Sequence, residues 1–460
     1  MKKISLIIFA VLCTGLSLVK AQYKLPAYEK FKLSNGLTVY LMEKHEVPVI
    51  SLSAIFPAGA IYDGSKAGLA SITANTLMTG SVNLPKAKLD EELDFMAANI
   101  DMFSSKEFSG LRSKFASKYK NRVLDIIKNI LLNPAFDKSE FEKEKSRTLV
   151  NLEQAKESPR AVIASYFDKA VYGNHVYGNV VSGTTSSVKG ISIDDVKRFY
   201  NENYYPEGSA IAVVGDFKTP EMKKMISELF SSWKKGTSKH TNAASNPISY
   251  PTEANVVLVN KDDARETTFY IGAPGINRNN PDYVAISVLN TYFGGRFTSL
   301  LNDELRVNSG LTYGARSVFS PLKNGGTFYI SSFTANKTTA EALDLAIQVL
   351  QKFHAGGITE ENLASAKNYI KGQFPPSYET AGQLANLLTQ MYWYDFNESF
   401  INNFEKNVDE LTVDKAKNII HKYFPSDKLQ FVLIGKADEI NMIAEKFGKV
   451  KMMDIKNDIP

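Results

Sequence analysis

Two stretches of the chain, IDDVKRFYNENYYPEGSAIAVVG at residues 193–215 and VDKAKNIIHKYFPSDKLQFVLIG at residues 413–435, follow one pattern. Each begins directly after a Ser or Thr, a helix-capping residue type, so a helix is predicted there. A Tyr-Pro or Phe-Pro pair follows, and an apolar run that ends in Gly then predicts a strand. The proline is offset by one residue, and a further helix follows in both stretches. We infer an internal duplication; a chance likeness between two ordinary helix–strand–helix units is the alternative.

The region between the repeats predicts a linker. Residues 236–255, GTSKHTNAASNPISYPTEAN, are rich in Ser, Thr, Asn and Pro and show no apolar periodicity. We therefore expect a leader at 1–21, an N-terminal domain at 22–235, the linker at 236–255 and a C-terminal domain at 256–460. Each domain then has roughly 210 residues, which is an ordinary domain size.

The first half predicts strands followed by clustered helices. Apolar and polar residues alternate at 31–33 and 37–41 around Asn35-Gly36, a hairpin signal, and a further strand is predicted at 49–56. Long helical patterns follow at 86–99, 121–132 and 138–156, with Pro159 expected to stop the last one. Strands in succession and segregated helices predict an α+β fold with largely antiparallel sheets.

The N-terminus has the pattern of a secretory signal. Lys2 and Lys3 precede a mostly apolar stretch at 4–19, and small residues then stand at the cleavage-setting positions before Gln22. An uncleaved anchor is the alternative. No later run has 18 apolar residues, so no membrane span is expected in the mature chain. We expect export across the inner membrane, to the periplasm of a bacterium.

Composition excludes several kinds of site. The single cysteine, Cys13, lies in the signal, so the mature chain is expected to have no disulfide, cysteine nucleophile or cysteine-bound metal. The net charge of +5 becomes +2 when Lys2, Lys3 and Lys20 are removed, and no block of basic residues stands out. Nucleic acid is therefore not an expected partner.

Residues 68–81, GLASITANTLMTGS, are expected on a helix after the third strand. Their flanks resemble the inverted zinc motif H-x-x-E-H of the pitrilysin/insulinase family of zinc peptidases, in its processing-peptidase-like branch. On that pattern Ser71 and Asn75 take the histidine positions and Ala74 takes the glutamate position. The third zinc ligand of the family, a glutamate on a later helix, corresponds to Asn151, 76 residues beyond Asn75.

Chemistry at these four positions is incompatible with the family's reaction. Residues i and i+4 share a helical face, so two imidazoles there can bind one ion, and the intervening glutamate deprotonates the zinc-bound water. Alcohol and carboxamide groups are poor zinc ligands at neutral pH, and a methyl group accepts no proton. Glu153 follows Asn151 by two residues and is expected on the opposite side of the helix. The five histidines, none within a helical turn of another, are residues 45, 175, 240, 354 and 421.

The resemblance extends through most of the chain. It continues at 174–178 (NHVYG) and, in the second half, from GGRFTSLLN at 294–302 to GLTY at 310–313. Arg306 and Tyr313 match the family's substrate-binding pair, which hydrogen-bonds the peptide near the scissile bond. The alternative is an arginine that caps a helix end and a strand tyrosine that packs in the core. The resemblance also implies two homologous domains, each a mainly antiparallel sheet covered by helices, in a clamshell.

Two further motifs are expected to be structural. His175 stands where the family often has a histidine outside the metal site, and a loop or packing role is expected for it. Ser186-Ser187-Val188-Lys189 fits S-x-x-K, but the companion motifs of that catalytic class are missing, so a loop leading into a helix is expected.

The resemblance therefore implies a non-catalytic subunit of a heterodimeric zinc metallopeptidase. Such a subunit would form a chamber with a homologous zinc-bearing partner and contribute Arg306 and Tyr313 to the binding of peptide or unfolded-protein substrates. No cofactor is expected in this chain, and zinc is expected in the partner. The alternatives are a peptide-binding or assembly protein with no peptidase partner, and an enzyme with an unrelated site, for which no candidate triad is present.

Overall fold

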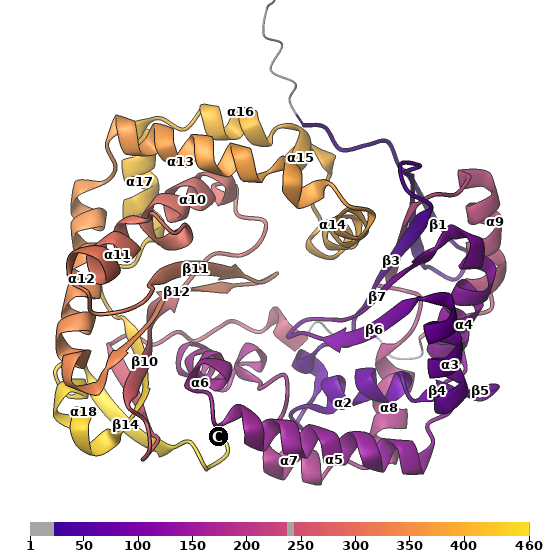
Figure 1. The fold of residues 1–460 in the computed structure, drawn as a ribbon, viewed down its shortest axis with the longest axis horizontal. Coiled ribbons are helices and arrows are strands. Elements are labelled where there is room, and N and C mark those ends of the chain that lie inside the picture. The colour runs from indigo at the N-terminus through magenta and orange to yellow at the C-terminus, as the bar shows by residue number, and fades with distance from the viewer. Residues whose placement is uncertain (1–22, 237–242, 460) are drawn as a thin grey trace, which may run out of the picture.

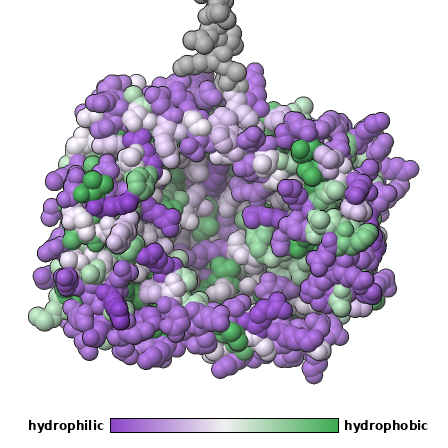
Figure 2. Space-filling model, in the orientation of Figure 1, coloured by the Kyte–Doolittle hydropathy of each residue, from purple (hydrophilic) through white to green (hydrophobic). Residues whose placement is uncertain are grey.

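The computed structural model describes residues 23–236 and 243–459, so the predicted leader, Cys13 and His240 lie outside it. The two halves of the chain form two lobes that face each other around a central hollow (Figure 1). The space-filling view shows the same hollow, with both polar and apolar residues lining its depth (Figure 2). Within the described residues, no helix is both long and apolar enough to cross a membrane.

The first lobe contains a six-stranded sheet in the order β1-β2-β8-β3-β7-β6. All neighbouring strands are antiparallel except β2 and β8, which are parallel. The predicted hairpin is confirmed, with β1 pairing β2 and the turn residue Gly36 at φ +99°. The strands are β1 (Glu29–Lys32), β2 (Thr38–Glu43), β3 (Val49–Phe56), β6 (Asn99–Ser104), β7 (Ser109–Ala116) and β8 (Ala210–Gly215).

The second lobe contains a sheet of the same size in the order β11-β12-β10-β13-β9-β14. Its central pairs are antiparallel, whereas β9 runs parallel to both β13 and β14. The strands are β9 (Asn255–Asn260), β10 (Glu266–Pro274), β11 (Arg316–Pro321), β12 (Gly326–Ala335), β13 (Gln430–Gly435) and β14 (Lys449–Asp454).

The two repeated stretches form equivalent elements. The first gives helix α8 (Ile193–Asn203) and strand β8, and the second gives helix α17 (Val413–Tyr423) and strand β13. Each strand lies in the interior of its sheet, between one parallel and one antiparallel neighbour. The predicted α+β fold with two equivalent, mainly antiparallel sheets is confirmed.

Each sheet is covered on its outer face by helices of its own half. In the first lobe Val39, Leu41 and Val213 point into a core shared with these helices. The outer helices of the first half are α2 (Leu69–Leu77), α3 (Lys86–Met96), α4 (Lys120–Leu132), α5 (Lys138–Ala155), α7 (Thr185–Lys189) and α9 (Thr219–Phe230), besides α8. Those of the second half are α10 (Tyr283–Asn290), α11 (Leu300–Asn302), α12 (Thr339–Gly356), α13 (Glu360–Gln373), α15 (Glu398–Asn402), α16 (Phe404–Asp409) and α18 (Ala437–Ala444), besides α17.

The inner face of each sheet is covered by a helix from the other half. Helix α14 (Ala381–Tyr394) packs on β3 and β8 of the first sheet, and α6 (Pro159–Tyr172) packs on β10 and β13 of the second. Both helices lie inside the ring (Figure 1). Strand residues alternate in direction, so Tyr40 and Met42 contribute to the core on the α14 side while their neighbours face outward. This reciprocal exchange joins the two lobes through apolar packing.

Two predicted helix boundaries differ from the structure. The helix expected at 86–99 ends at Met96, because Ala97 adopts a left-handed conformation with φ +48° and Asn99 already begins β6. Pro159, expected to stop a helix, instead opens α6 at its first position, where the missing N–H has no cost. Helix α5 ends by itself at Ala155.

Candidate functional site

Helix α2 carries three of the four predicted motif positions and is anchored at its start by Asp63. One carboxylate oxygen of Asp63 accepts a hydrogen bond from the Gly68 amide at 2.8 Å, and the other accepts one from the Ala70 amide at 2.7 Å. These bonds satisfy two of the amides that a helix N-terminus leaves free. Burial raises the pKa of the Asp63 carboxyl to about 7, while the two amide donors act in the opposite direction.

Gly68 fits α2 tightly against the loop at Gly183. Gly68 has a φ of +90°, and a Cβ there would lie 2.8 Å from the Cα of Gly183. Both the conformation and the contact therefore require glycine at position 68. The flanking glycine identified in the sequence sets where α2 begins and how closely it packs.

The motif positions lie on two helices that pack against each other. Ser71 and Asn75 are half-buried on α2, whereas Ala74 between them is fully buried in the core of the first lobe. Asn151 is exposed on α5, and α5 packs against α2. The two helices to which the resemblance assigns the zinc motif are thus in contact, but their side chains at these positions are poor ligands for the ion. They offer an alcohol, a methyl group and two carboxamides.

The described residues contain no group of three His, Cys, Asp or Glu side chains placed to hold a metal ion. The structure does bring together two histidines that the sequence places far apart, His354 on α12 and His421 on α17, with ring centroids 4.6 Å apart. Two imidazoles do not complete a tetrahedral zinc site. Their proximity could not be read from helical spacing, because it arises between two helices.

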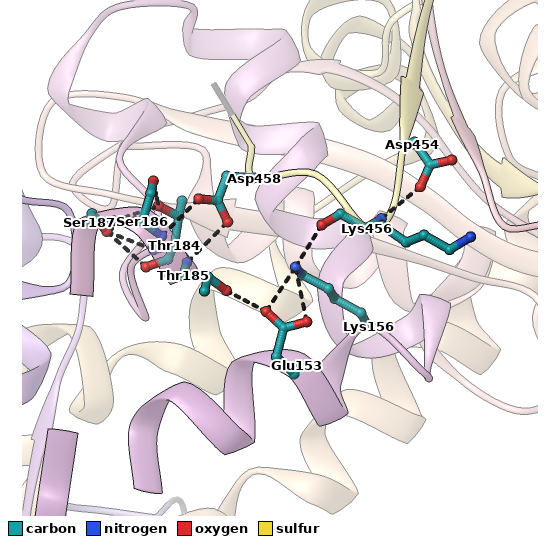
Figure 3. A network of polar contacts seen from close by, with 9 residues as sticks. All are labelled: Glu153, Lys156, Thr184, Thr185, Ser186, Ser187, Asp454, Lys456 and Asp458. Carbon is teal, nitrogen blue, oxygen red and sulfur yellow. Dashed lines mark hydrogen bonds and ion pairs between the residues drawn. The ribbon is translucent and has the colours of Figure 1, made fainter. Parts of the chain in front are cut away.

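Glu153, the acidic residue nearest to Asn151 in sequence, takes part in a polar network (Figure 3). Its carboxylate accepts hydrogen bonds from the Thr185 hydroxyl at 2.6 Å and from the Lys156 ammonium at 3.2 Å. Asp458, near the C-terminus, accepts from the amides of Thr185 and Ser186 at 3.0 and 2.8 Å. The network joins the C-terminal segment to α5 and α7, so Glu153 has a structural role.

The electrostatics of Asp458 fit this role. Burial alone would raise the pKa of its carboxyl, but hydrogen bonds from Ser186 and Thr185 and the charge of Lys156 outweigh that effect and hold the pKa below its usual value. The carboxylate is therefore ionised at neutral pH, as a group that caps the first turn of α7 should be.

The two smaller sequence motifs have local roles. The His175 imidazole lies within hydrogen-bond distance of the Tyr177 amide and the Asn246 carbonyl, both at 3.2 Å, which makes it a loop-packing residue. The S-x-x-K sequence forms α7, where the Ser187 hydroxyl donates to the carbonyl of Ala67 at 2.7 Å. This bond ties α7 to the start of α2.

Arg306 and Tyr313 flank an exposed loop of the second lobe. Arg306 lies in the π-helical turn η6 (Asp303–Asn308), with its guanidinium carbon 4.5 Å from the ring centroid of Phe297. Tyr313 precedes β11 and is 84% exposed, and Phe297 is 70% exposed. The alternative in which Tyr313 packs in the core therefore does not describe this tyrosine.

Asn302, which sequence reasoning missed, holds this loop in place. Its carboxamide donates to the carbonyl of Phe297 at 2.7 Å and accepts from the amide of Ala315 at 3.1 Å, while the residue is only 4% exposed. One buried side chain thus fixes the segments on both sides of Arg306 and Tyr313. The sequence signal that could have identified it is the asparagine that ends the segment GGRFTSLLN, which is Asn302.

A pocket of about 480 Å³ opens beside Tyr313, where the start of α6 meets the second sheet. Its walls come from α6, β10, β12, the loop at 294–297 and the segment that leads into β11. Arg306 does not line the pocket but packs on Phe297, which does. Of the predicted substrate-binding pair, Tyr313 therefore lines this pocket and Arg306 is linked to it through Phe297, whereas the four motif positions belong to the other lobe.

Two family models match consecutive parts of the chain. Residues 38–185 match the insulinase model of peptidase family M16, and residues 190–370 match the model described as the peptidase M16 inactive domain. The first match covers α2 and α5, and the second covers the loop with Arg306 and Tyr313.

Relatives of this chain in bacteria carry differing names. An uncharacterized zinc protease YmxG of Bacillus subtilis is 21% identical over 76% of this chain and 85% of its own length. A non-peptidase homologue YmxG of Helicobacter pylori is 24% identical over 85% of this chain and 90% of its own. Both proteins are similar to this chain over both halves.

Solved structures share the fold. The crystal structure of a peptidase M16 inactive domain from Pseudomonas fluorescens matches with a TM-score of 0.82 and 24% identity, covering 89% of this chain and 98% of its own. A protease from Helicobacter pylori matches with a TM-score of 0.81 and 20% identity over 89% of this chain. The chain therefore belongs to the insulinase family, peptidase family M16, and it carries neither histidine nor glutamate at the positions that the resemblance assigns to the zinc motif.

Proposed function

We propose that this chain is the non-catalytic subunit of a heterodimeric zinc metallopeptidase. It pairs with a homologous chain that carries an intact H-x-x-E-H motif, encloses a chamber with it and contributes substrate contacts to peptide hydrolysis. Zinc is held by the partner alone. The observation that carries the proposal is that α2 packs against α5, while Ser71, Asn75 and Asn151 stand at the positions that the resemblance assigns to the zinc ligands.

The second lobe supports a role in substrate binding. A guanidinium and a phenol are hydrogen-bond donors suited to a peptide carbonyl. Tyr313 lines the pocket, and Arg306 packs on Phe297, which also lines it. The rings of Tyr313 and Phe297 are largely exposed, and exposed aromatic surface favours an interaction with a partner or substrate. The proposed partner would place its zinc across the chamber from this rim.

The rival proposal is a peptide-binding or assembly protein that has no peptidase partner. In both proposals the N-terminal pattern at 1–21 directs export to the periplasm, where the chain would meet peptides and unfolded proteins. The relative from Helicobacter pylori that is named a non-peptidase homologue agrees with either role. Peptidase activity, measured on a mixture of this chain and a homologue with the intact motif, distinguishes the two proposals.

The test is reconstitution with a homologue from the same organism that has the intact motif. Each chain alone and the mixture are assayed for association, for zinc and for hydrolysis of a peptide library. We expect a stable complex with zinc in the partner and a rate well above that of the partner alone. A mixture no more active than the partner would contradict the proposal and favour the rival.

Arg306→Ala then tests the substrate contact. We expect it to lower kcat/KM of the complex by about tenfold or more, because a charge-assisted hydrogen bond contributes about 1.5–3 kcal/mol. Assembly, followed by size-exclusion chromatography, should be unchanged. Arg265→Ala is the matched control, since Arg265 is exposed in the turn between β9 and β10. An unchanged rate for Arg306→Ala would remove this residue from the proposed site.

A further inference from the structure

The pocket beside Tyr313 is strongly cationic. Arg160 from α6, Arg296 from the loop after η5 (Thr291–Gly295) and Arg316 from the start of β11 all line it. No Asp or Glu is among the lining residues. Three guanidinium groups from three separate elements thus converge on one cavity of about 480 Å³.

These arginines are not neutralised within the described part of the chain. Other arginines pair with carboxylates, as Arg122 does with Glu92 at 2.6 Å and Arg198 with Asp195 at 2.6 Å. In contrast, no described Asp or Glu lies within 4.0 Å of the guanidinium groups that line the pocket. Their positive charge is therefore available to a ligand.

Neutral contacts hold two of these guanidinium groups in place. The Arg160 guanidinium lies 3.7 Å from the ring centroid of Phe333, a cation–π contact. Arg296 donates to the carbonyl of Thr298 at 3.2 Å and to the hydroxyl of Ser365 at 3.0 Å. These contacts restrict the side chains without cancelling their charge, which is how a preorganised anion site is built.

The equivalent pocket of the first lobe is different. It lies where the start of α14 meets β3 and β7, and it has a volume of about 840 Å³. Its three basic residues, Lys44, Arg112 and Lys114, share it with Glu46 and Glu379, and Lys44 pairs with Glu46 at 2.9 Å. The first-lobe pocket thus has an excess of one basic residue over its acidic residues, whereas the second-lobe pocket has an excess of three.

We propose that the second-lobe pocket binds a carboxylate of the peptide substrate, either an acidic side chain or the free chain end. Guanidinium groups bind carboxylates through paired hydrogen bonds. The aromatic residues Tyr270, Phe333 and Tyr369 among the lining provide apolar contact for the rest of the bound residue. The inference rests on the proposed function, because it assigns that function a preference for acidic peptides bound next to Tyr313.

The test is isothermal titration calorimetry of the purified full chain with four short peptides of one length. They differ only in an internal Glu or Gln and in a free or amidated C-terminus. We expect at least one carboxylate-bearing peptide to bind about tenfold tighter than the amidated Gln peptide, with an advantage that shrinks at high salt. The pair of peptides that differs identifies the source of the carboxylate.

The double variant Arg160→Gln/Arg316→Gln should lose this preference, while Arg265→Gln should retain it. Arg160 and Arg316 are exposed, so thermal melting should show that the double variant still folds. Equal affinities for all four peptides, binding of none of them, or a preference that survives the double variant would overturn the inference. All of these results come from binding to the isolated chain, whereas peptide hydrolysis by the reconstituted wild-type complex tests the proposed function separately.

Discussion

Helix α2 and the loop around Tyr313 are the two regions that the resemblance identifies as functional, and their surroundings are opposite. Seven of the nine residues of α2 are buried, including Ala74 at the position of the catalytic glutamate. The loop instead exposes Tyr313 and Phe297 and borders a pocket lined by arginines. Helix α2 is therefore part of the first lobe's core, whereas the loop exposes its aromatic side chains to solvent.

The difference shows that the position of a helix and the side chains that a reaction would need are determined by different residues. Asp63 and Gly68 position α2 through its backbone, so the helix keeps its place whatever side chains occupy positions 71, 74 and 75. The loop has no comparable apolar packing for its exposed rings, and Asn302 holds its backbone instead. The loop in the second lobe and the substituted motif positions in the first lobe together agree with the proposed subunit, which would bind substrate without cleaving it.

The largest effect is expected from Ala74→Glu. Position 74 is 0% exposed, so the new carboxylate would be buried without a partner. We expect the free energy of unfolding in urea to fall by about 3 kcal/mol or more. Asn75→Glu, at a half-buried position, should cost about 1 kcal/mol or less. If Ala74→Glu were as stable as the wild type, position 74 would have to be open to solvent, as an active-site residue is. The contrast between a buried α2 and an exposed loop would then be wrong.

A smaller, pH-dependent effect is expected at the anchor of α2. The pKa of Asp63 is raised from 3.8 to about 7, so the stability held by its protonated form is present below about pH 4 and is lost as the pH rises through about 7. Asp63→Asn should lower stability by about 1–3 kcal/mol, because an amide of α2 loses its acceptor. The variant should also lose less stability than the wild type between about pH 5 and about pH 8.

Asp344→Asn, at an exposed site on α12, is the control for this measurement. Urea unfolding of the three proteins at both pH values provides the comparison. If the wild type and Asp63→Asn change in stability by the same amount over this interval, the anchor is ionised throughout, and the electrostatic description of α2 would be wrong.

The smallest effect on stability is expected from Tyr313→Ala. Because the side chain is 84% exposed, the free energy of unfolding should change by about 0.5 kcal/mol or less. Peptide hydrolysis by the complex should nevertheless fall by about tenfold, as expected when a substrate hydrogen bond is removed. Tyr172→Ala, at a 2% exposed position, should do the reverse and destabilise the fold. A large loss of stability in Tyr313→Ala would mean that the tyrosine is structural.

Much of the fold could be predicted from local patterns. Strand β3 has the predicted bounds, and helices α4 and α5 begin or end within a residue of theirs, because apolar periodicity and capping residues act locally. The repeated stretches predicted α8 with β8 and α17 with β13 for the same reason. The resemblance, rather than periodicity, pointed to the four motif positions and to Arg306 and Tyr313.

Long-range arrangement could not be read in this way. The exchange of α6 and α14 between lobes depends on which sheet face each helix covers, and an amphipathic pattern does not name its partner surface. The pocket draws Arg160 and Arg316 together from positions 156 residues apart, and Asp63 reaches amides five and seven residues away. Such contacts emerge only from the folded chain.

Zinc content of the isolated chain tests the central claim most directly. The purified chain, incubated with zinc and then freed of unbound metal by gel filtration, should retain far less than one zinc ion per molecule, and Asn75→Ala should not change that content. Retention of about one ion per chain, lost in Asn75→Ala or Asn151→Ala, would show that these side chains form a metal site and would contradict the assignment of a non-catalytic subunit.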